Sequence, residues 1–288
     1  AALIAGAVMI SRSVDETDAQ IPDLLGAGLL AVAIAALTLG LVEGPDWGWT
    51  DPRIVGAWIV AAVALAGFIV SSTRHRVPVI DPALLRVRSF AFSNLTAVLF
   101  AIPFAGALLA NILWLQQVWG YSAIKTGFAV STGPLMVPIF AAVAHRLSAR
   151  IPVGVIVSAG CVLFGLGGVL IALSVDSTPD CATEILPGWL IGGIGVGLAL
   201  PSILSSATAD LPAHQAATGS AVVNMSRQIG MALGVSLLVA ILGTPIGYAA
   251  AHNAFQEAWW VLAVVAVAGA VAALGMTPPK TPSTPPAG

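Results

Sequence analysis

The stretch NMSRQIGMALGVSLLVAIL, residues 224–242, is as apolar as a membrane-spanning segment, yet it opens with an asparagine, an arginine and a glutamine. Asn224, Arg227 and Gln228, with Ser220 before them, are spaced three or four residues apart, so they share one face of a helix. Burying a lone cation in hydrocarbon costs from a few to more than about 10 kcal/mol. Arg227 must therefore either reach the membrane surface by extending its side chain, or face a polar cavity inside the protein.

The rest of the chain is equally apolar. Of its 288 residues, 58% are hydrophobic and 8% are charged, and the mean hydropathy is +0.97. A soluble domain carries about 25% charged residues, so this sequence cannot cover a water-facing surface. The net charge is -2, and no basic patch is present that would bind nucleic acid. The composition predicts an all-α polytopic membrane protein that is embedded in the lipid bilayer.

The stretches without charged residues give the number of spans, because a helix of about 20 residues crosses about 30 Å of hydrocarbon. These stretches are 24–42, 54–73, 89–124, 126–145, 151–175, 185–209, 228–256 and 258–279. We expect the seventh helix to begin earlier, near Ala213, and to contain Arg227. About eight transmembrane helices follow, with none of the 13 acidic residues in the middle of a span. Residues 1–10 are predicted to end a preceding helix, so we expect the chain to be a fragment that lacks its N-terminal part.

The basic residues predict the orientation of the chain. Eight of them fall on one side of the membrane, and these are Arg12, Arg74, Arg76, Arg86, Arg88, Arg146, Arg150 and Lys280. The other side receives only Arg53 and Lys125. By the positive-inside rule, the connector 11–23, the basic loop 74–88 and the proline-rich tail 277–288 are cytoplasmic. We expect that tail to be disordered.

Polar and small residues concentrate in the last six spans, 89–276. We take Asn111, Gln116 and Gln117 on one helix, and Asn224, Arg227 and Gln228 on another, as candidates for a substrate pathway, since a polar stripe within a span indicates a water-lined cavity. A second set holds the candidates for close helix packing or for hinges in a moving gate. This set is Gly188, Gly192, Gly193, Gly197, Gly230, Gly234, Pro134 and Pro138. Glycines spaced four apart let helix backbones approach closely in lipid.

The sequence offers no candidate for catalysis. The segment GYSAIKTG resembles a phosphate-binding loop, but Ile124 stands before Lys125 where a glycine is required. The four histidines show no spacing typical of metal ligands, and no nucleophile motif GxSxG is present. We therefore predict no enzyme activity, no metal and no cofactor.

Three segments together resemble a known family. These are ANILWLQQVWGYSAIKTGFAVSTGPLMVP (110–138), TGSAVVNMSRQIGMALGVSLL (218–238) and VPVIDPALLRVRSFAFSN (77–94). They resemble EmrB/QacA-type drug:proton antiporters, which are fourteen-span members of the major facilitator superfamily. The segment AHRLSARIP (144–152) is loosely similar to the basic cytoplasmic turn of that superfamily, but it lacks the usual aspartate and second glycine.

The resemblance implies a domain organisation and a function. Residues 1–10 would end the sixth span, 24–73 would form two inserted helices, and 89–276 would form the C-terminal six-helix half. The implied function is proton-coupled efflux of small hydrophobic or cationic compounds across the bacterial plasma membrane. Substrate would bind between this half and a missing N-terminal half, which would hold the proton-coupling carboxylates. Two alternatives stay open: an exporter of a metabolite such as an amino acid or siderophore, and a truncated protein with no transport activity.

Overall fold

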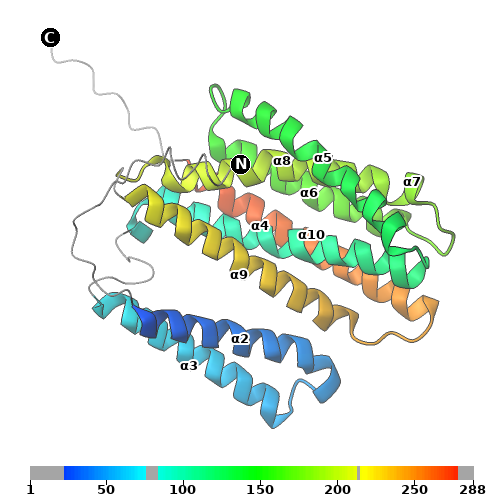
Figure 1. The fold of residues 1–288 in the computed structure, drawn as a ribbon, viewed down its shortest axis with the longest axis horizontal. Coiled ribbons are helices and arrows are strands. Elements are labelled where there is room, and N and C mark those ends of the chain that lie inside the picture. Colours follow the sequence, from blue (N-terminus) through cyan, green and yellow to red (C-terminus); the bar gives the residue numbers. More distant parts are fainter. Residues whose placement is uncertain (1–22, 76–83, 213–214, 278–288) are drawn as a thin grey trace, which may run out of the picture.

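A computed structural model describes residues 23–75, 84–212 and 215–277, and these residues form a bundle of helices (Figure 1). The long helices are α2 (Leu24–Trp47), α3 (Pro52–Arg74), α4 (Arg88–Leu113), α5 (Ala123–Leu147), α6 (Val153–Ser174), α8 (Leu186–Ala209), α9 (Ala216–Leu242) and α10 (Tyr248–Leu274). The short elements are the 3-10 turn η1 (Leu84–Arg86), the π-helical turn η2 (Trp114–Val118) and α7 (Cys181–Glu184).

Eight of the described helices are long and apolar enough to cross a membrane. This confirms the predicted all-α polytopic fold with eight spans. The predicted helix end 1–10, the connector 11–23 apart from Asp23, and the tail 277–288 apart from Thr277 lie outside the described residues, as do Arg12, Arg76 and Lys280.

Short polar side chains begin several of these helices. The carboxylate of Asp23 accepts a 2.7 Å hydrogen bond from the backbone N–H of Gly26 at the start of α2. Asp51 caps α3 in the same way, accepting from Arg53 N–H at 2.8 Å, and Pro52 follows it at the first helical position. Such caps satisfy backbone donors that a helix start leaves unpaired.

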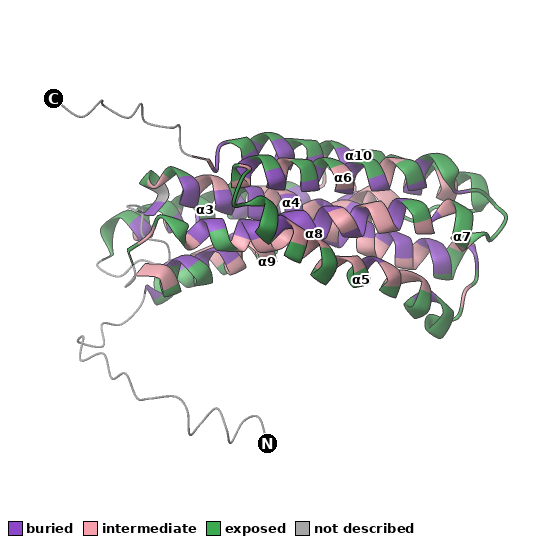
Figure 2. Cartoon of the chain, turned by 90° about the horizontal axis from the view of Figure 1, so that it is seen from above, coloured by how far each residue is buried: buried purple, intermediate pink, exposed green. Residues whose placement is uncertain are grey.

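The six long helices from α4 to α10, with α7 as a short connection, form one bundle. α4 packs against α9, α10 and α8, while α8 packs against α5 and α6. Figure 1 shows α5 and α9 on opposite flanks of the bundle, with α4 and α8 between them. Figure 2 shows α6 and α10 together on the side away from α5 and α9. The face between α5 and α9 is therefore the one that α6 and α10 do not cover.

Helices α2 and α3 form a separate hairpin that packs against α9 through α2. Aromatic rings pack against two glycines of α2. Gly40 contacts Trp58 of α3, and Gly44 contacts Trp49 of the connecting turn. Many large apolar side chains of the hairpin are exposed, including Val63 and Ile59. Such exposed apolar side chains are typical of helices that face lipid.

The structure corrects three of the predicted span boundaries. Helix α2 continues to Trp47 instead of ending at residue 42, and the stretch 89–124 ends as a helix at Val118. The stretch 228–256 is two helices: α9 stops at Leu242, and α10 starts at Tyr248. Between these helices, glycines with positive φ (52° at residue 243 and 84° at 247) turn the chain without using a charged residue.

The prediction that no acidic residue lies in the middle of a span was also wrong. Glu257 separates two charge-free stretches, but it is not a loop residue, because α10 runs through it from Tyr248 to Leu274. It lies about 14 Å along the helix axis from the first residue of α10. Its side chain is exposed on the outside of the bundle. An acidic residue therefore does lie within a span.

Candidate substrate pathway

The two helices that carry the predicted polar residues, α4 and α9, are packed along much of their length. The Ser226 hydroxyl on α9 donates a buried 2.8 Å hydrogen bond to Oδ1 of Asn94 on α4. One turn further along, a Cβ at Gly230 would lie 2.6 Å from the carbonyl oxygen of Val98. A further turn along, a Cβ at Gly234 would clash with the carbonyl of Ile102. The contacts advance by four residues on both helices, so α4 and α9 run parallel and their backbones touch.

Arg227 follows Ser226 directly and is half-buried, as is Asn224. Ser220 and Gln228 on the same predicted face are exposed. The Nε of Arg227 is buried and has no hydrogen-bond partner among the described residues, while the amide of Asn224 donates to the carbonyl of Ser220 at 2.9 Å. Because Ser226 contacts Asn94 near the start of α4, the guanidinium group lies toward the end of the bundle that holds the arginine-rich loops.

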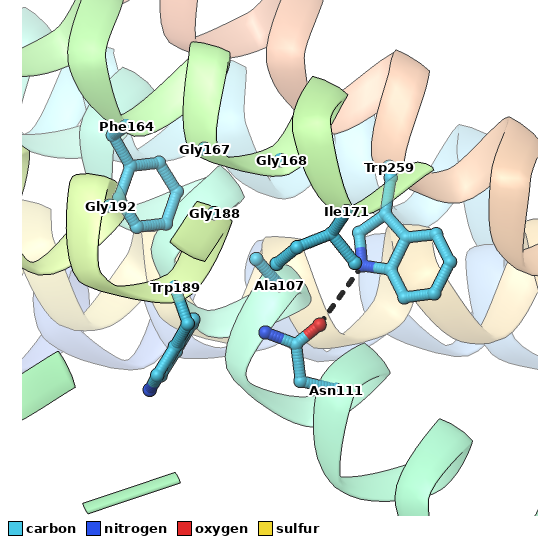
Figure 3. A pocket seen from close by; sticks show the side chains of 10 residues that line it. All are labelled: Ala107, Asn111, Phe164, Gly167, Gly168, Ile171, Gly188, Trp189, Gly192 and Trp259. Carbon is cyan, nitrogen blue, oxygen red and sulfur yellow. Dashed lines mark hydrogen bonds between the residues drawn. The ribbon is translucent and has the colours of Figure 1, made fainter. Parts of the chain in front are cut away.

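Asn111 lies inside the bundle rather than on its open face. It is 1% exposed, and its Oδ1 accepts a 3.1 Å hydrogen bond from the indole of Trp259 on α10. Its Nδ2 is buried without a partner in the described part of the chain. Figure 3 shows this amide nitrogen pointing away from Trp259 among residues that line a cavity of about 10 Å³, which include Gly188 and Trp189. That space matches about one water molecule.

Gln116 and Gln117 lie on the π-helical turn η2 at the other end of α4, and both are exposed. The preceding Trp114 is fully buried. Its ring contacts those of Trp119, Tyr248, His252, Phe255 and Trp259, with centroids 5.4–6.4 Å apart. Gln117 lines a hollow of about 640 Å³ beside the α9–α10 loop. The turn therefore directs the ring of Trp114 inward, while Gln117 lines an open vestibule and Gln116 is exposed beside it in sequence.

The structure does not bring the two predicted polar groups to one level of the membrane. Asn94 is level with Ser226, and Asn111 follows Asn94 by 17 residues on the same helix. At 1.5 Å per residue this is about 25 Å along the bundle axis. Asn111, Gln116 and Gln117 therefore lie near one end of the bundle, and Asn224, Arg227 and Gln228 lie near the other.

Between these ends, an apolar cavity of about 170 Å³ opens among α4, α5, α6 and α8. Its lining residues are Phe104, Leu108, Gly133, Pro134, Val137, Phe164, Trp189, Gly193, Val196 and Leu200. Most of these residues were not predicted as functional, because apolar side chains in an apolar sequence carry no distinguishing pattern. Only the glycine and proline candidates pointed to this place.

The predicted glycines lie at sites of close helix contact. On α8, a Cβ at Gly188 would lie 2.5 Å from the Gly167 carbonyl oxygen of α6. Gly192 faces Phe164 on the same neighbour. Gly193 and Gly197 face α5 instead: a Cβ at Gly193 would clash with the carbonyl of Gly133, and one at Gly197 would lie 2.7 Å from Cβ of Phe140. Pro134 and Pro138 both lie within α5.

The described basic residues of the predicted cytoplasmic loops gather at one end of the bundle. Arg74 ends α3 and Arg88 begins α4, while Arg86, Arg146 and Arg150 are exposed there. The Nε of Arg88 donates a 3.1 Å hydrogen bond to the carbonyl of Gly275, which satisfies an acceptor beyond the end of α10. One arginine of this basic end, Arg88, therefore also caps the C-terminal end of α10.

The opposite end carries acidic groups in the loop after α6. Hydrogen bonds from the hydroxyl and backbone N–H of Thr178 lower the pKa of Asp176. Desolvation raises the pKa of Glu184, whose carboxylate accepts from the Asp176 N–H at 2.9 Å. At pH values above its ordinary pKa, the Asp176 carboxylate therefore stabilises this turn. That stabilisation is lost as the pH falls through the lowered pKa of Asp176. Within the described ranges, no three histidine, cysteine or acidic side chains are grouped as metal ligands would be.

Comparison with known proteins finds similar sequences among bacterial resistance and export proteins. The chain is 30% identical over 220 residues to the multidrug resistance protein Stp of Mycobacterium tuberculosis, an alignment that covers 76% of this chain and 40% of Stp. It is 28% identical to the methylenomycin A resistance protein of Streptomyces coelicolor, over 82% of this chain and 50% of that protein. It is 27% identical to the tetracenomycin C resistance and export protein of Streptomyces glaucescens, over 90% of this chain and 47% of that protein. The chain is also similar to the MFS-type transporter YhcA of Bacillus subtilis, at 25% identity over 76% of this chain and 41% of that protein, so its similarity is to transporters of the major facilitator superfamily.

These similarities confirm the resemblance found in the sequence. No family model matches the sequence. Among solved structures, the nucleoside transporter NupG (D323A mutant) superposes with a TM-score of 0.53 at 14% identity, over 86% of this chain and 65% of that one. The fold is therefore that of a major facilitator transporter. The chain spans about half the length of the curated relatives that it matches.

Proposed function

We propose that this protein belongs to the major facilitator superfamily and exports small hydrophobic or cationic compounds across the bacterial plasma membrane in exchange for protons. The apolar cavity among α4, α5, α6 and α8 carries this proposal. Aromatic and aliphatic walls are typical of pockets that bind drug-sized molecules. The polar residues at the two ends of the bundle would line the entry to and the exit from this cavity. The names of the relatives, which are resistance and export proteins, support the same direction of transport.

The chain would supply one half of the transporter, preceded by the two inserted helices α2 and α3. Alternating access requires one repeat to rock against another around a site at their interface. The face of the bundle between α5 and α9 is available for a second half, because α6 and α10 lie on the opposite side (Figure 2). The partners are then the lipid bilayer, the N-terminal half, the substrate and protons.

Proton coupling would depend mainly on that second half. Glu257 is the acidic residue that lies well inside a described span, and it is exposed on α10, which contributes no residue to the cavity lining. Inverted membrane vesicles containing residues 1–288 alone are therefore expected to show no substrate-dependent proton movement. Vesicles that contain the complete transporter, with both halves present, are expected to show ethidium-dependent proton movement. Substrate-dependent proton movement with residues 1–288 alone would contradict the assignment of proton coupling to the second half. Absence of proton movement with the complete transporter would contradict the proposed function.

We infer that the arginine-rich end of the bundle, where α10 also ends at Leu274, faces the cytoplasm. Arg74, Arg86, Arg88, Arg146 and Arg150 lie at this end, whereas Arg53 and Lys125 lie at the other. Cytoplasmic loops of membrane proteins carry such an excess of basic residues. The acidic loop after α6 would then face outward.

A specific observation favours a second candidate function, the export of an anionic metabolite. The buried Nε of Arg227 has no partner among the described residues, and a guanidinium group offers several fixed donors to a carboxylate. Transport measured in parallel with ethidium and with a radiolabelled acidic amino acid would separate the two substrate classes. Uptake of the amino acid alone into inverted vesicles would favour the metabolite exporter.

A further inference from the structure

Trp189 on α8 makes an unusual hydrogen bond to the neighbouring helix α5. Its indole N–H donates to the backbone carbonyl of Val130 at 2.8 Å. The ring is 7% exposed and forms part of the wall of the apolar cavity. Figure 3 shows the indole nitrogen at the far end of the side chain, directed away from Phe164. A side chain of α8 therefore bonds to the backbone of α5 beside the cavity.

The acceptor of this bond is the carbonyl that α5 itself cannot satisfy in the regular way. In an α-helix the carbonyl of residue 130 accepts from the N–H of residue 134. Residue 134 is Pro134, which has no backbone N–H. A carbonyl without a donor in the apolar interior of a membrane protein is unfavourable. The indole of Trp189 supplies the donor that Pro134 removes.

Glycines allow the indole to reach the backbone at this point. A Cβ at Gly133 would lie 2.5 Å from the indole Nε1 of Trp189. One turn along α8, Gly193 faces the carbonyl of Gly133 so closely that a Cβ there would clash. The two helices are therefore in backbone contact directly beside the proline. A small change in the bend of α5 would alter this contact and the cavity together.

We propose that Trp189 is a positioning residue for transport, whose indole N–H replaces the missing helix bond at Pro134 and so fixes the bend of α5 beside the cavity. Proline is a common point of helix bending, and Pro134, Val137 and Trp189 all line the cavity. Breaking the Trp189–Val130 bond frees the part of α5 beyond Pro134 to swing. The effect on transport rests on the proposed function, whereas the effect on the geometry of α5 does not.

Spin-label distances in the intact protein test the geometry without any transport measurement. The background replaces Cys161 and Cys181, the two cysteines of the chain. One label pair, at the exposed positions Ala142 on α5 and Val155 on α6, reports the segment beyond Pro134. A second pair, at the exposed positions Phe128 on α5 and Leu173 on α6, reports the segment before it. The variant Trp189→Phe keeps an aromatic ring and removes the N–H.

We expect Trp189→Phe to broaden the distance distribution of the 142–155 pair and to leave that of the 128–173 pair unchanged. Adding Pro134→Ala restores a backbone N–H for the Val130 carbonyl, so it should narrow the distribution again. Trp119→Phe is the matched control, since Trp119 donates an indole bond of 3.0 Å to the carbonyl of Asp176 in a loop. Pro134→Ala should not rescue any effect of Trp119→Phe.

Ethidium efflux by the same variants tests the link to transport. We expect Trp189→Phe to slow efflux by roughly fivefold, the change in an equilibrium that one net hydrogen bond produces, and Pro134→Ala to restore part of that rate. An unchanged 142–155 distribution in Trp189→Phe, or equal broadening with and without Pro134, would overturn the proposal. Broadening without any change in ethidium efflux would overturn the transport role and leave the α5 geometry standing. No efflux by the unmodified protein would refute the proposed function instead.

Discussion

Ser226 on α9 and Asn94 on α4 are joined by a buried 2.8 Å hydrogen bond, and this contact sets the register in which the two helices pack. The amide of Asn94 also donates to the carbonyl of Phe90 at 2.8 Å, so the asparagine orientation is fixed by two bonds. Gly230 and Gly234 continue the contact toward the other end of the membrane. Arg227, next to Ser226 in sequence, is thereby held beside the contact and near the basic end of the bundle.

The first prediction concerns this hydrogen bond. Ser226→Ala and Asn94→Ala should each destabilise the protein in detergent, and the double variant should cost less than the sum of the two. The expected coupling is about 0.6 kcal/mol, the average for hydrogen bonds between membrane helices, and at most about 1.7 kcal/mol. A double-mutant cycle in the free energy of unfolding measures it. Strictly additive effects would show that the two side chains do not interact.

The second prediction concerns the glycines that lie at backbone contacts. Gly230→Val should destabilise the bundle by roughly 1–3 kcal/mol, because the added side chain meets the backbone of α4 at Val98. Gly127→Val is the matched control, since a Cβ at Gly127 on α5 meets nothing within 4 Å. Thermal unfolding of both variants in the same detergent checks the difference. Equal loss of stability at both positions would argue against a packing role for Gly230.

The third prediction concerns orientation. Single cysteines at Thr73, Ala149 and Thr178, all exposed, would be introduced after Cys161 and Cys181 are replaced. A thiol reagent that cannot cross membranes, added to intact cells, should label only position 178. Strong labelling at position 149 would invert the assigned orientation.

The fourth prediction concerns Arg227. If its guanidinium faces the pathway, Arg227→Lys loses the planar set of donors and Arg227→Ala loses the charge as well. Both should slow transport by roughly tenfold or more, which corresponds to about 1.4 kcal/mol, without preventing membrane insertion. Gln228→Ala should have a milder effect. If Arg227 instead reaches the cytoplasmic surface, lysine would serve equally well, so normal transport by Arg227→Lys at normal expression would reject the pathway role.

The sequence predicted those parts of the fold that depend on apolar length and on local helix signals. Charge-free stretches of about 20 residues gave eight spans, because water-free hydrocarbon leaves few alternatives to a helix. The boundary between α9 and α10 was missed, because the loop between them contains no charge, whereas Glu257, which divides the two charge-free stretches, lies within α10. In a membrane protein, glycines such as Gly243 end a helix as effectively as charges do.

The candidate site was less predictable, because it depends on how separate helices pack. Polar residues stand out in an apolar sequence, so Asn111 and Arg227 were identified, but their separation along the bundle axis follows only from the α4–α9 register. The apolar wall of the cavity carries no sequence signal. Trp189 could have been noticed only by asking which side chain satisfies the carbonyl that Pro134 leaves without a donor, and its partner becomes known only from the packing of α8 on α5.

The central claim is that substrate passes through the apolar cavity among α4, α5, α6 and α8, and filling that cavity tests it most directly. Leu108 lines the cavity, and Leu108→Trp would fill part of it with a larger side chain. Leu173→Trp is the matched control, because Leu173 is 65% exposed on α6 and does not line the cavity. The measurement is ethidium transport by the intact protein in proteoliposomes with an imposed pH gradient. Transport should be lost in Leu108→Trp and retained in Leu173→Trp, and normal transport by correctly inserted Leu108→Trp would contradict the claim.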